Sequence, residues 1–335
     1  MGCTYTSNCW KCFENLSEFK NDNNIITPIN EVITTDPQKI SYLIKIQSHY
    51  RGMKVREKLK NNEQNEQNEQ IEISIDKDEF TTLINLYPPL NDNIPVELRP
   101  PTPYPSDRTK YYGEWDTSKN IRHGRGILVW SEGSKYLGYW VNDKANIKGK
   151  LIHQDGDIYD GEWVDDRPNG KGKYFHKDGT IYVGEWKNDK QDGKGKEKWV
   201  DGAWYEGEYK EGKKHGKGKF FWADGSSYEG TFEDNKISGE GVYIFGDQRK
   251  YEGKWTNNKM NGYGVFTWPD GRKYIGNYKN DKKEGYGEFI WNDGKRYKGN
   301  WRNGKQHGEG EFFFPTQKIW KKGNWKDGKR INWIE

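Results

Sequence analysis

A five-residue pattern that returns at a fixed interval sets the strongest limit on how this chain can fold. It reads Tyr-x-Gly-x-Trp, with Tyr or Phe also found in the last place, and its copies lie 25 residues apart once and 23 residues apart thereafter. A fixed period of this kind is typical of stacked supersecondary units, because each unit alone cannot bury its apolar face. The nine copies begin at Tyr111, Tyr136, Tyr159, Tyr182, Tyr205, Tyr228, Tyr251, Tyr274 and Tyr297.

The spacing within each copy predicts two β-strands. Side chains alternate between the faces of a strand, so the Tyr, Gly and Trp of the pattern share one face. A Gly-x-Gly pair and further aromatics follow with the same alternation, and in the seventh copy Pro-Asp-Gly at 269–271 suits a tight hairpin turn. This register predicts Phe266 opposite Tyr274 and Gly264 opposite Gly276, with the glycines leaving room for rings that lie across the backbone.

The composition favours a core made of rings. Hydrophobic residues make up 31% of the chain and aromatic residues 15%, so aliphatic side chains are too few for an ordinary thick core. Two strands per repeat, about 4.8 Å apart, would build a twisted ribbon roughly 90 Å long. We therefore expect a mainly β fold, an elongated single-layer antiparallel sheet over residues 111–335. The residues expected to be structural in it are Tyr159, Gly161, Trp163, Gly170, Gly172, Tyr182, Gly184, Trp186, Tyr251, Gly253 and Trp255.

These residues resemble MORN repeats, since spacing, aromatics and glycines recur together over about two thirds of the chain. The resemblance implies stacked hairpins that serve as a scaffold for protein partners near membranes or the cytoskeleton, and it leaves open a homodimer of two rods. Direct phospholipid binding is also proposed for this family. The copy at Tyr136 and a degenerate tenth copy around Trp320 depart most from the pattern, and we expect them to cap the array.

Residues 36–60 predict a basic amphipathic helix, in which residues 39–60 carry seven Lys or Arg residues against Glu57, a net +6. Within it, residues 46–56 resemble an IQ motif, Ile-Gln-x-x-x-Arg-Gly-x-x-x-Arg, at all five fixed positions. The resemblance implies binding of calmodulin or a calmodulin-like light chain, which would receive the apolar side of the helix in a groove and meet its cations with acidic residues. The alternative is an ordinary amphipathic helix docked on the body of the protein. The motif residues are Ile46, Gln47, Arg51, Gly52 and Arg56.

The first residues fit a lipid anchor. The opening Met-Gly-Cys-Thr-Tyr-Thr matches the pattern for attaching myristate to Gly2, and palmitate on Cys3 would supply the second signal that stable anchoring needs. The alternative is an unmodified flexible terminus over residues 1–35. This segment lacks the apolar stretch of a secretory signal, and no run in the sequence is long and apolar enough to span a membrane.

Residues 61–110 are expected to link the helix to the repeats. Asn-Glu-Gln occurs three times in succession over 62–70, a polar low-complexity tract that cannot bury a core. Residues 71–86 could form a short strand and a helix. Seven of the twelve prolines then lie between Pro88 and Pro105, which predicts a stiff, extended, proline-rich segment.

No set of residues suggests catalysis. All three cysteines lie within the first twelve residues, and their C-x-x-C spacing lacks the second pair that zinc sites use. His123, His215 and His307 occupy one repeat position and form no triad or metal cluster in the sequence pattern. Lysines alternate with acidic residues without a basic run. We therefore expect no enzyme activity, no cofactor and no nucleic-acid partner.

The main hypothesis is a non-enzymatic scaffold or tether. Its IQ helix would bind calmodulin, and its rod would organise protein partners at the cytoplasmic face of a membrane or at the cell cortex. The basic helix could also lie on acidic membrane lipid until calmodulin captures it, at roughly 1 kcal/mol per cation; binding to anionic vesicles that persists when calmodulin is added would contradict this switch. Two alternatives stay open: a structural subunit of a ciliary axoneme or cortical cytoskeleton, and a phosphoinositide-binding module.

Overall fold

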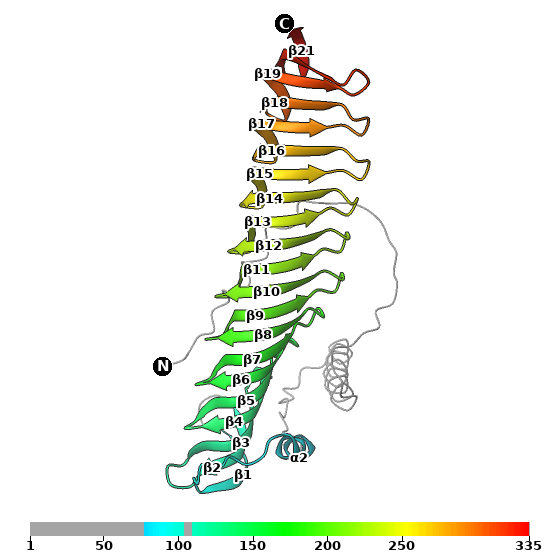
Figure 1. Ribbon diagram of the computed structural model, residues 1–335. Coiled ribbons are helices and arrows are strands. Elements are labelled where there is room, and N and C mark those ends of the chain that lie inside the picture. Colours follow the sequence, from blue (N-terminus) through cyan, green and yellow to red (C-terminus); the bar gives the residue numbers. More distant parts are fainter. Residues whose placement is uncertain (1–76, 104–108, 335) are drawn as a thin grey trace, which may run out of the picture. The chain divides into compact units, whose positions relative to one another are not determined.

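A computed structural model describes residues 77–103 and 109–334. These residues form one helix, α2 (Lys77–Leu86), and one sheet of 21 strands. Each strand pairs antiparallel with the strand before it and the strand after it, so the sheet is a single meander from β1 to β21 (Figure 1). The strands are β1 (Val96–Pro103), β2 (Lys110–Asp116), β3 (Ile121–Val129), β4 (Lys135–Val141), β5 (Lys144–Ile152), β6 (Ile158–Val164), β7 (Arg167–Phe175), β8 (Ile181–Lys187), β9 (Lys190–Lys198), β10 (Trp204–Lys210), β11 (Lys213–Phe221), β12 (Ser227–Glu233), β13 (Lys236–Ile244), β14 (Lys250–Thr256), β15 (Lys259–Thr267), β16 (Lys273–Lys279), β17 (Lys282–Ile290), β18 (Arg296–Arg302), β19 (Lys305–Phe314), β20 (Ile319–Lys326) and β21 (Lys329–Trp333).

The expected single-layer antiparallel sheet is confirmed, and so is its register. Phe266 on β15 lies opposite Tyr274 on β16, and Gly264 lies opposite Gly276. The turn between them closes with a hydrogen bond from the Gly271 amide to the Trp268 carbonyl, 3.0 Å long. The expected helix at 36–60, the terminus at 1–35 and the Asn-Glu-Gln tract lie outside the described residues.

The sheet begins before Tyr111, the first residue of the expected array. β1 lies within the stretch expected to be a proline-rich linker, and it pairs with β2 from Val96 opposite Asp116 to Pro103 opposite Lys110. Proline lacks an amide proton and is therefore confined to edge strands or irregular positions of a sheet. The ladder is irregular between Arg99 and Thr102, where two of the prolines lie. An edge position thus reconciles the prolines with a strand.

The core is a row of rings on one face of the sheet, here called the tyrosine face. The tyrosine that opens each repeat is at most 1% exposed. Each packs edge-to-face against the aromatic ring of its own Tyr-x-Gly-x-Trp pattern and against that of the next repeat, with centroids 4.9 to 5.8 Å apart. Such pairs add about 0.5–1.5 kcal/mol each beyond burial. One continuous zigzag of rings therefore holds the repeats together.

A two-residue turn within each repeat complements the ring row. Most copies place Asn or Asp at both turn positions with positive φ, for example Asn188 at 49° and Asp189 at 67°. These angles match the type I′ hairpin turn, whose twist suits paired strands. The predicted Pro-Asp-Gly turn is the other turn of the repeat; this one was not predicted, although paired Asn and Asp residues at a fixed position signal it.

Helix α2 explains why the first two repeats differ from the rest. Its Phe80 and Leu83 are buried, and the Phe80 ring lies 4.3 Å from that of Tyr112. The helix packs beside β3 on the face opposite the tyrosines, here called the outer face, where Ile127 and Leu137 are also buried. Apolar residues replace charged ones at these positions because a helix covers them.

Candidate functional site

The sequence-predicted residues fall into two groups in the structure. Gly2, Cys3 and the five motif residues Ile46, Gln47, Arg51, Gly52 and Arg56 lie outside the described residues. The predicted structural residues all lie within the tyrosine face or at its bends. Tyr159, Tyr182 and Tyr251 are buried, and the indole nitrogens of Trp163, Trp186 and Trp255 donate to the carbonyls of Gly149, Gly172 and Gly241.

The glycines leave space that the tyrosine rings fill. A Cβ added to Gly161 would lie 2.5 Å from the Cα of Gly172, and one added to Gly172 would lie 2.5 Å from the hydroxyl of Tyr159. Gly184 and Gly253 take the same place in their repeats. Gly170 has φ 95°, a value that favours glycine. These residues build the fold rather than a site.

A bulge in each hairpin explains the polar residues beside the tyrosine row. In the repeat that begins at Tyr159, the register shifts between Gly161 and Trp163. The tyrosine hydroxyl donates to the carbonyl of Glu162 at 2.9 Å, and the Glu162 carboxylate accepts the Lys171 amide at 3.0 Å. All nine opening tyrosines donate to the carbonyl three residues on. The hydroxyl therefore satisfies a backbone acceptor at the bulge.

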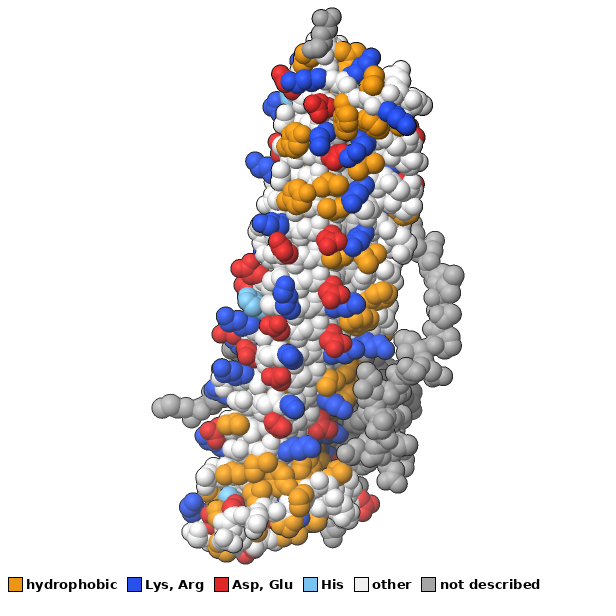
Figure 2. All heavy atoms as spheres, viewed as in Figure 1, with side chains coloured by type: hydrophobic (Ala, Val, Ile, Leu, Met, Phe, Trp, Pro, Cys, Tyr) orange, Lys and Arg blue, Asp and Glu red, His pale blue; other side chains and the backbone are white. Residues whose placement is uncertain are grey.

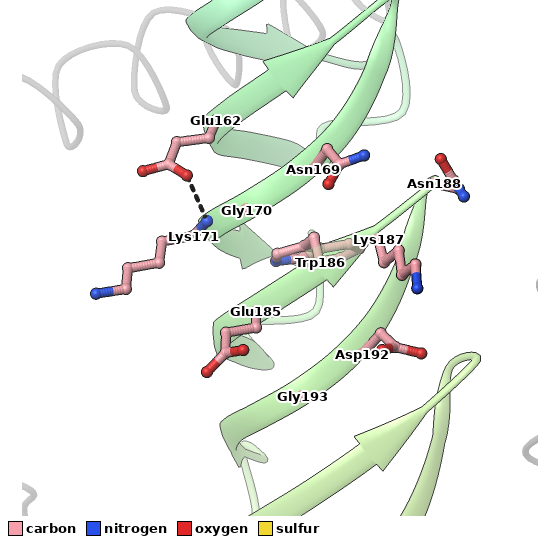
Figure 3. Close-up of a pocket in the computed structure, with 10 residues that line it drawn as sticks. All are labelled: Glu162, Asn169, Gly170, Lys171, Glu185, Trp186, Lys187, Asn188, Asp192 and Gly193. Carbon is pink, nitrogen blue, oxygen red and sulfur yellow. Dashed lines mark hydrogen bonds between the residues drawn. The ribbon is translucent and has the colours of Figure 1, made fainter.

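Open hollows recur along the sheet next to these bulges. Figure 3 shows one of about 470 Å³, with Glu162 and Glu185 on one side, Lys187 and Asp192 on the other, and Trp186 between them. A second hollow of about 540 Å³ repeats the arrangement one unit further along the chain. Acidic and basic groups line both, so each can accept a polar side chain of a partner. Neither gathers the convergent groups that catalysis needs.

The outer face offers a larger surface than these hollows, and its residues change along the array. Lysines at alternate positions of β5, β7, β9 and β11 face acidic residues on neighbouring strands, with ion pairs of 3.7 Å for Lys150–Asp160, 2.9 Å for Lys196–Glu206 and 3.5 Å for Lys219–Glu229. Figure 2 shows red and blue side chains alternating along the middle of this face, with apolar side chains near both ends. This face is our candidate interaction surface, which the repeat pattern alone did not single out.

Comparison with known families decides what the array is. A family model of the MORN repeat matches nine consecutive segments, at residues 111–135, 136–158, 159–181, 182–204, 205–227, 228–248, 251–271, 274–296 and 297–318. The chain belongs to the MORN-repeat family. MORN repeats suggest a repeat scaffold or a membrane-binding module. None of the curated proteins compared with the chain matches it.

Solved structures share only a distant likeness. The TCP10 domain of Danio rerio CPAP is 13% identical, covers 62% of this chain and 99% of its own length, and has a TM-score of 0.35. The TCP domain of SAS-4 (dCPAP) from Drosophila melanogaster, solved in complex with a proline-rich motif of Ana2 (dSTIL), is 14% identical, covers 46% and 84%, and has a TM-score of 0.30. Scores this low carry no argument about the function of the MORN array.

Within 77–103 and 109–334, no group of three or more His, Cys, Asp or Glu side chains is arranged to hold a metal ion. In that part of the chain, no helix has the length and apolar character that crossing a bilayer requires.

One MORN repeat holds a half-buried cation among rings. Lys283 lies opposite Tyr278 on the tyrosine face, and its ammonium nitrogen is 4.4 to 5.4 Å from the centroids of four rings, those of Phe289, Trp301, Tyr274 and Trp268. Lys214 at the same repeat position pairs with the buried carboxylate of Glu197 at 3.0 Å. Among the described residues, no ion pair joins Lys283 to a carboxylate. Burial, with a smaller contribution from Arg272, lowers the pKa of Lys283 to about 8.

Replacing Lys283 by methionine is expected to stabilise the array by about 1–2 kcal/mol at neutral pH, because the cost of burying the charge exceeds what the rings return. Met260 fills this position in the preceding repeat. The unfolded chain holds this proton up to its ordinary pKa of 10.5, so the penalty is complete below about pH 8 and disappears as the pH rises to 10.5. Denaturant unfolding of Lys283→Met and of the unaltered chain at neutral pH and at pH 10.5 measures this gain in stability. A gain that is equal at the two pH values would contradict the assignment to the buried charge.

Proposed function

We propose that this MORN protein is a non-enzymatic scaffold whose outer face holds protein partners. The observation that carries the proposal is the division of each repeat into two sets of residues. The tyrosine face repeats the same Tyr, Gly and ring contacts from one unit to the next, whereas the outer face changes from repeat to repeat. A surface that varies on a constant frame can present different sites along one sheet.

Charge on the outer face favours proteins over lipid as partners of the repeats. Exposed lysines such as Lys171 and Lys194 lie opposite Glu185 and Glu208 on the next strand. Anionic lipid attracts unbalanced clusters of cations. A face on which the two signs alternate suits a protein surface with complementary charges.

Calmodulin binding belongs to the same proposal and is supported by the sequence of residues 46–56. The motif combines the apolar Ile46 with cations at Arg51 and Arg56, which suits an acidic partner with an apolar groove. Gly2 and Cys3 would carry the lipid that brings the scaffold to a membrane or to the cell cortex. The intact mass of the native protein tests this anchor, and an unmodified terminus would favour the axonemal or cytoskeletal subunit instead.

Calorimetry of the full chain with calmodulin, with calcium and with a chelator, tests the assignment of the motif. We expect saturable one-to-one binding and at least a tenfold loss of affinity in Ile46→Glu, because a charge enters the apolar groove. Ser48→Ala changes a position that the motif does not fix and serves as the matched control, with affinity within twofold of the unaltered chain. Equal affinity for both variants, or no binding by the unaltered chain, would contradict the assignment.

A further inference from the structure

Cross-strand residue pairs on the outer face join each repeat to the next. At every junction the second residue of a repeat pairs with the fifteenth of the repeat before it, or with the seventeenth in the longer first repeat. The nine pairs are Ile127–Leu137, Lys150–Asp160, Lys173–Val183, Lys196–Glu206, Lys219–Glu229, Val242–Glu252, Val265–Ile275, Glu288–Lys298 and Glu311–Lys322.

Two of these nine pairs are apolar on both sides, and their exposure differs. Ile127 and Leu137, the first pair, are 0% and 9% exposed in the presence of α2. Val265 and Ile275, the second pair, are both half-exposed, and Tyr263 and Tyr286 beside them are 56% and 57% exposed. These four residues form what we call the second patch. Two large exposed rings beside an aliphatic pair suggest a binding surface on a sheet face where most of the other junction pairs contain a charged residue.

The contacts of α2 define what its own site provides. The ring of Tyr139 lies on the outer face, and its hydroxyl donates to the Pro88 carbonyl just beyond the helix at 2.6 Å. The ammonium group of Lys135 pairs with Glu79 in the first helical turn at 2.7 Å. Three elements thus hold α2 in place: an apolar pair, a tyrosine hydroxyl that binds the end of the helix, and a lysine that binds its acidic first turn.

The second patch offers the same three kinds of group, two of them at the corresponding positions. Val265–Ile275 takes the place of the apolar pair. Tyr263 lies across from Asn277 as Arg125 lies across from Tyr139, so the tyrosine of the second patch stands on the other strand of this cross-strand pair, at the position of Arg125. Lys273 precedes Tyr274 as Lys135 precedes Tyr136, and it supplies the cation.

We propose that the second patch binds a short amphipathic helix of a partner protein, one with an acidic first turn and an apolar stripe, in the manner of α2. Apolar side chains would cover Val265 and Ile275, an acidic residue would pair with Lys273, and the tyrosine hydroxyls would meet carbonyls at the end of the helix. The proposal rests on the scaffold function proposed above and gives that scaffold a class of partner.

A labelled peptide with the sequence of residues 77–91 is a suitable probe, because it carries α2 and its first following residues. It is titrated against the full chain, whose own α2 occupies the first site, and fluorescence anisotropy reports binding. We expect saturable one-to-one binding that is at least tenfold weaker in Ile275→Glu. Glu252 occupies this repeat position in the preceding unit, so the substitution suits the fold. The matched control is Val183→Glu at the same position outside the patch, with affinity within twofold of the unaltered chain.

Reversal of charge adds a test of orientation. Lys273→Glu should weaken binding of the peptide, and a peptide with Glu79→Lys should restore it. Absence of saturable binding, or equal binding by Ile275→Glu and the unaltered chain, would overturn the proposal. A dimer in sedimentation that Ile275→Glu dissociates would assign the patch to a second copy and would also overturn it. Calmodulin affinity, measured on the same Ile275→Glu protein, should not change, which separates this result from a failure of the scaffold hypothesis.

Discussion

Replacing Gly184 by alanine is expected to destabilise the array by about 3 kcal/mol or more, because the added methyl group has no room on the tyrosine face. Its Cβ would lie 2.6 Å from the Cα of Gly195 and 2.7 Å from the carbonyl oxygen of Lys194. Both are backbone atoms of the neighbouring strand, so no side-chain rotation relieves the clash. Guanidinium unfolding followed by tryptophan fluorescence gives the difference in free energy.

A turn glycine provides the control for this prediction. Gly202 has φ 90°, and nothing lies within 4 Å of a Cβ placed on it. Gln248 occupies the same position of the next repeat but one, with φ 68°. Gly202→Gln should therefore cost only about 1 kcal/mol, the price of a positive φ in a residue other than glycine. Equal losses at Gly184 and Gly202 would mean that flexibility, rather than space, explains the repeated glycines.

Tyr205→Leu is expected to lower the unfolding free energy by about 3 kcal/mol, because leucine keeps only about half of the side-chain atoms and leaves a cavity where the ring lay. The ring is 0% exposed and packs edge-to-face on Tyr209 at 5.2 Å and on Phe232 at 5.1 Å. It belongs to two repeats at once, so its loss weakens the junction as well as the unit. Thermal and guanidinium unfolding of the full chain measure the effect.

Tyr205→Phe separates the hydroxyl from the ring. The hydroxyl donates to the Glu208 carbonyl at 2.9 Å, at the bulge of its repeat. Removing it should cost about 1–1.5 kcal/mol, since the carbonyl loses its partner while the ring contacts remain. A loss in Tyr205→Phe as large as that in Tyr205→Leu, or no loss at all, would contradict the role given to the hydroxyl.

The tyrosine face could be predicted closely because its signal repeats. Alternation along two strands and the Pro-Asp-Gly turn were enough to place Phe266 opposite Tyr274. Most of the type I′ turns contain neither Gly nor Pro at their central positions, so only the paired Asn and Asp residues signal them. β1 could not be predicted because prolines argue against a central strand and do not reveal that a strand lies at an edge.

The outer face could not be predicted in the same way, because its residues do not repeat. Leu137 is buried and Tyr139 bonds to the Pro88 carbonyl only because α2 and the residues after it lie on this face, which the repeat pattern does not reveal. The likeness of Val265–Ile275 to Ile127–Leu137 depends on cross-strand register, which joins residues of different repeats. The rings around the ammonium group of Lys283 likewise come from different repeats. The proposed binding surface therefore rests on departures from the repeat, which the repeat pattern itself does not reveal.

The most direct test of the account compares the unfolding free energies of Gly184→Ala and Ile275→Glu, measured together on the full chain. We infer a division of roles in which the tyrosine face stabilises the sheet and the outer face forms the binding surface. It predicts a loss of about 3 kcal/mol or more for Gly184→Ala and a change within about 0.5 kcal/mol for Ile275→Glu, as expected for surface substitutions. Comparable losses in the two variants would show that the outer face also holds the sheet together and would contradict the division of roles.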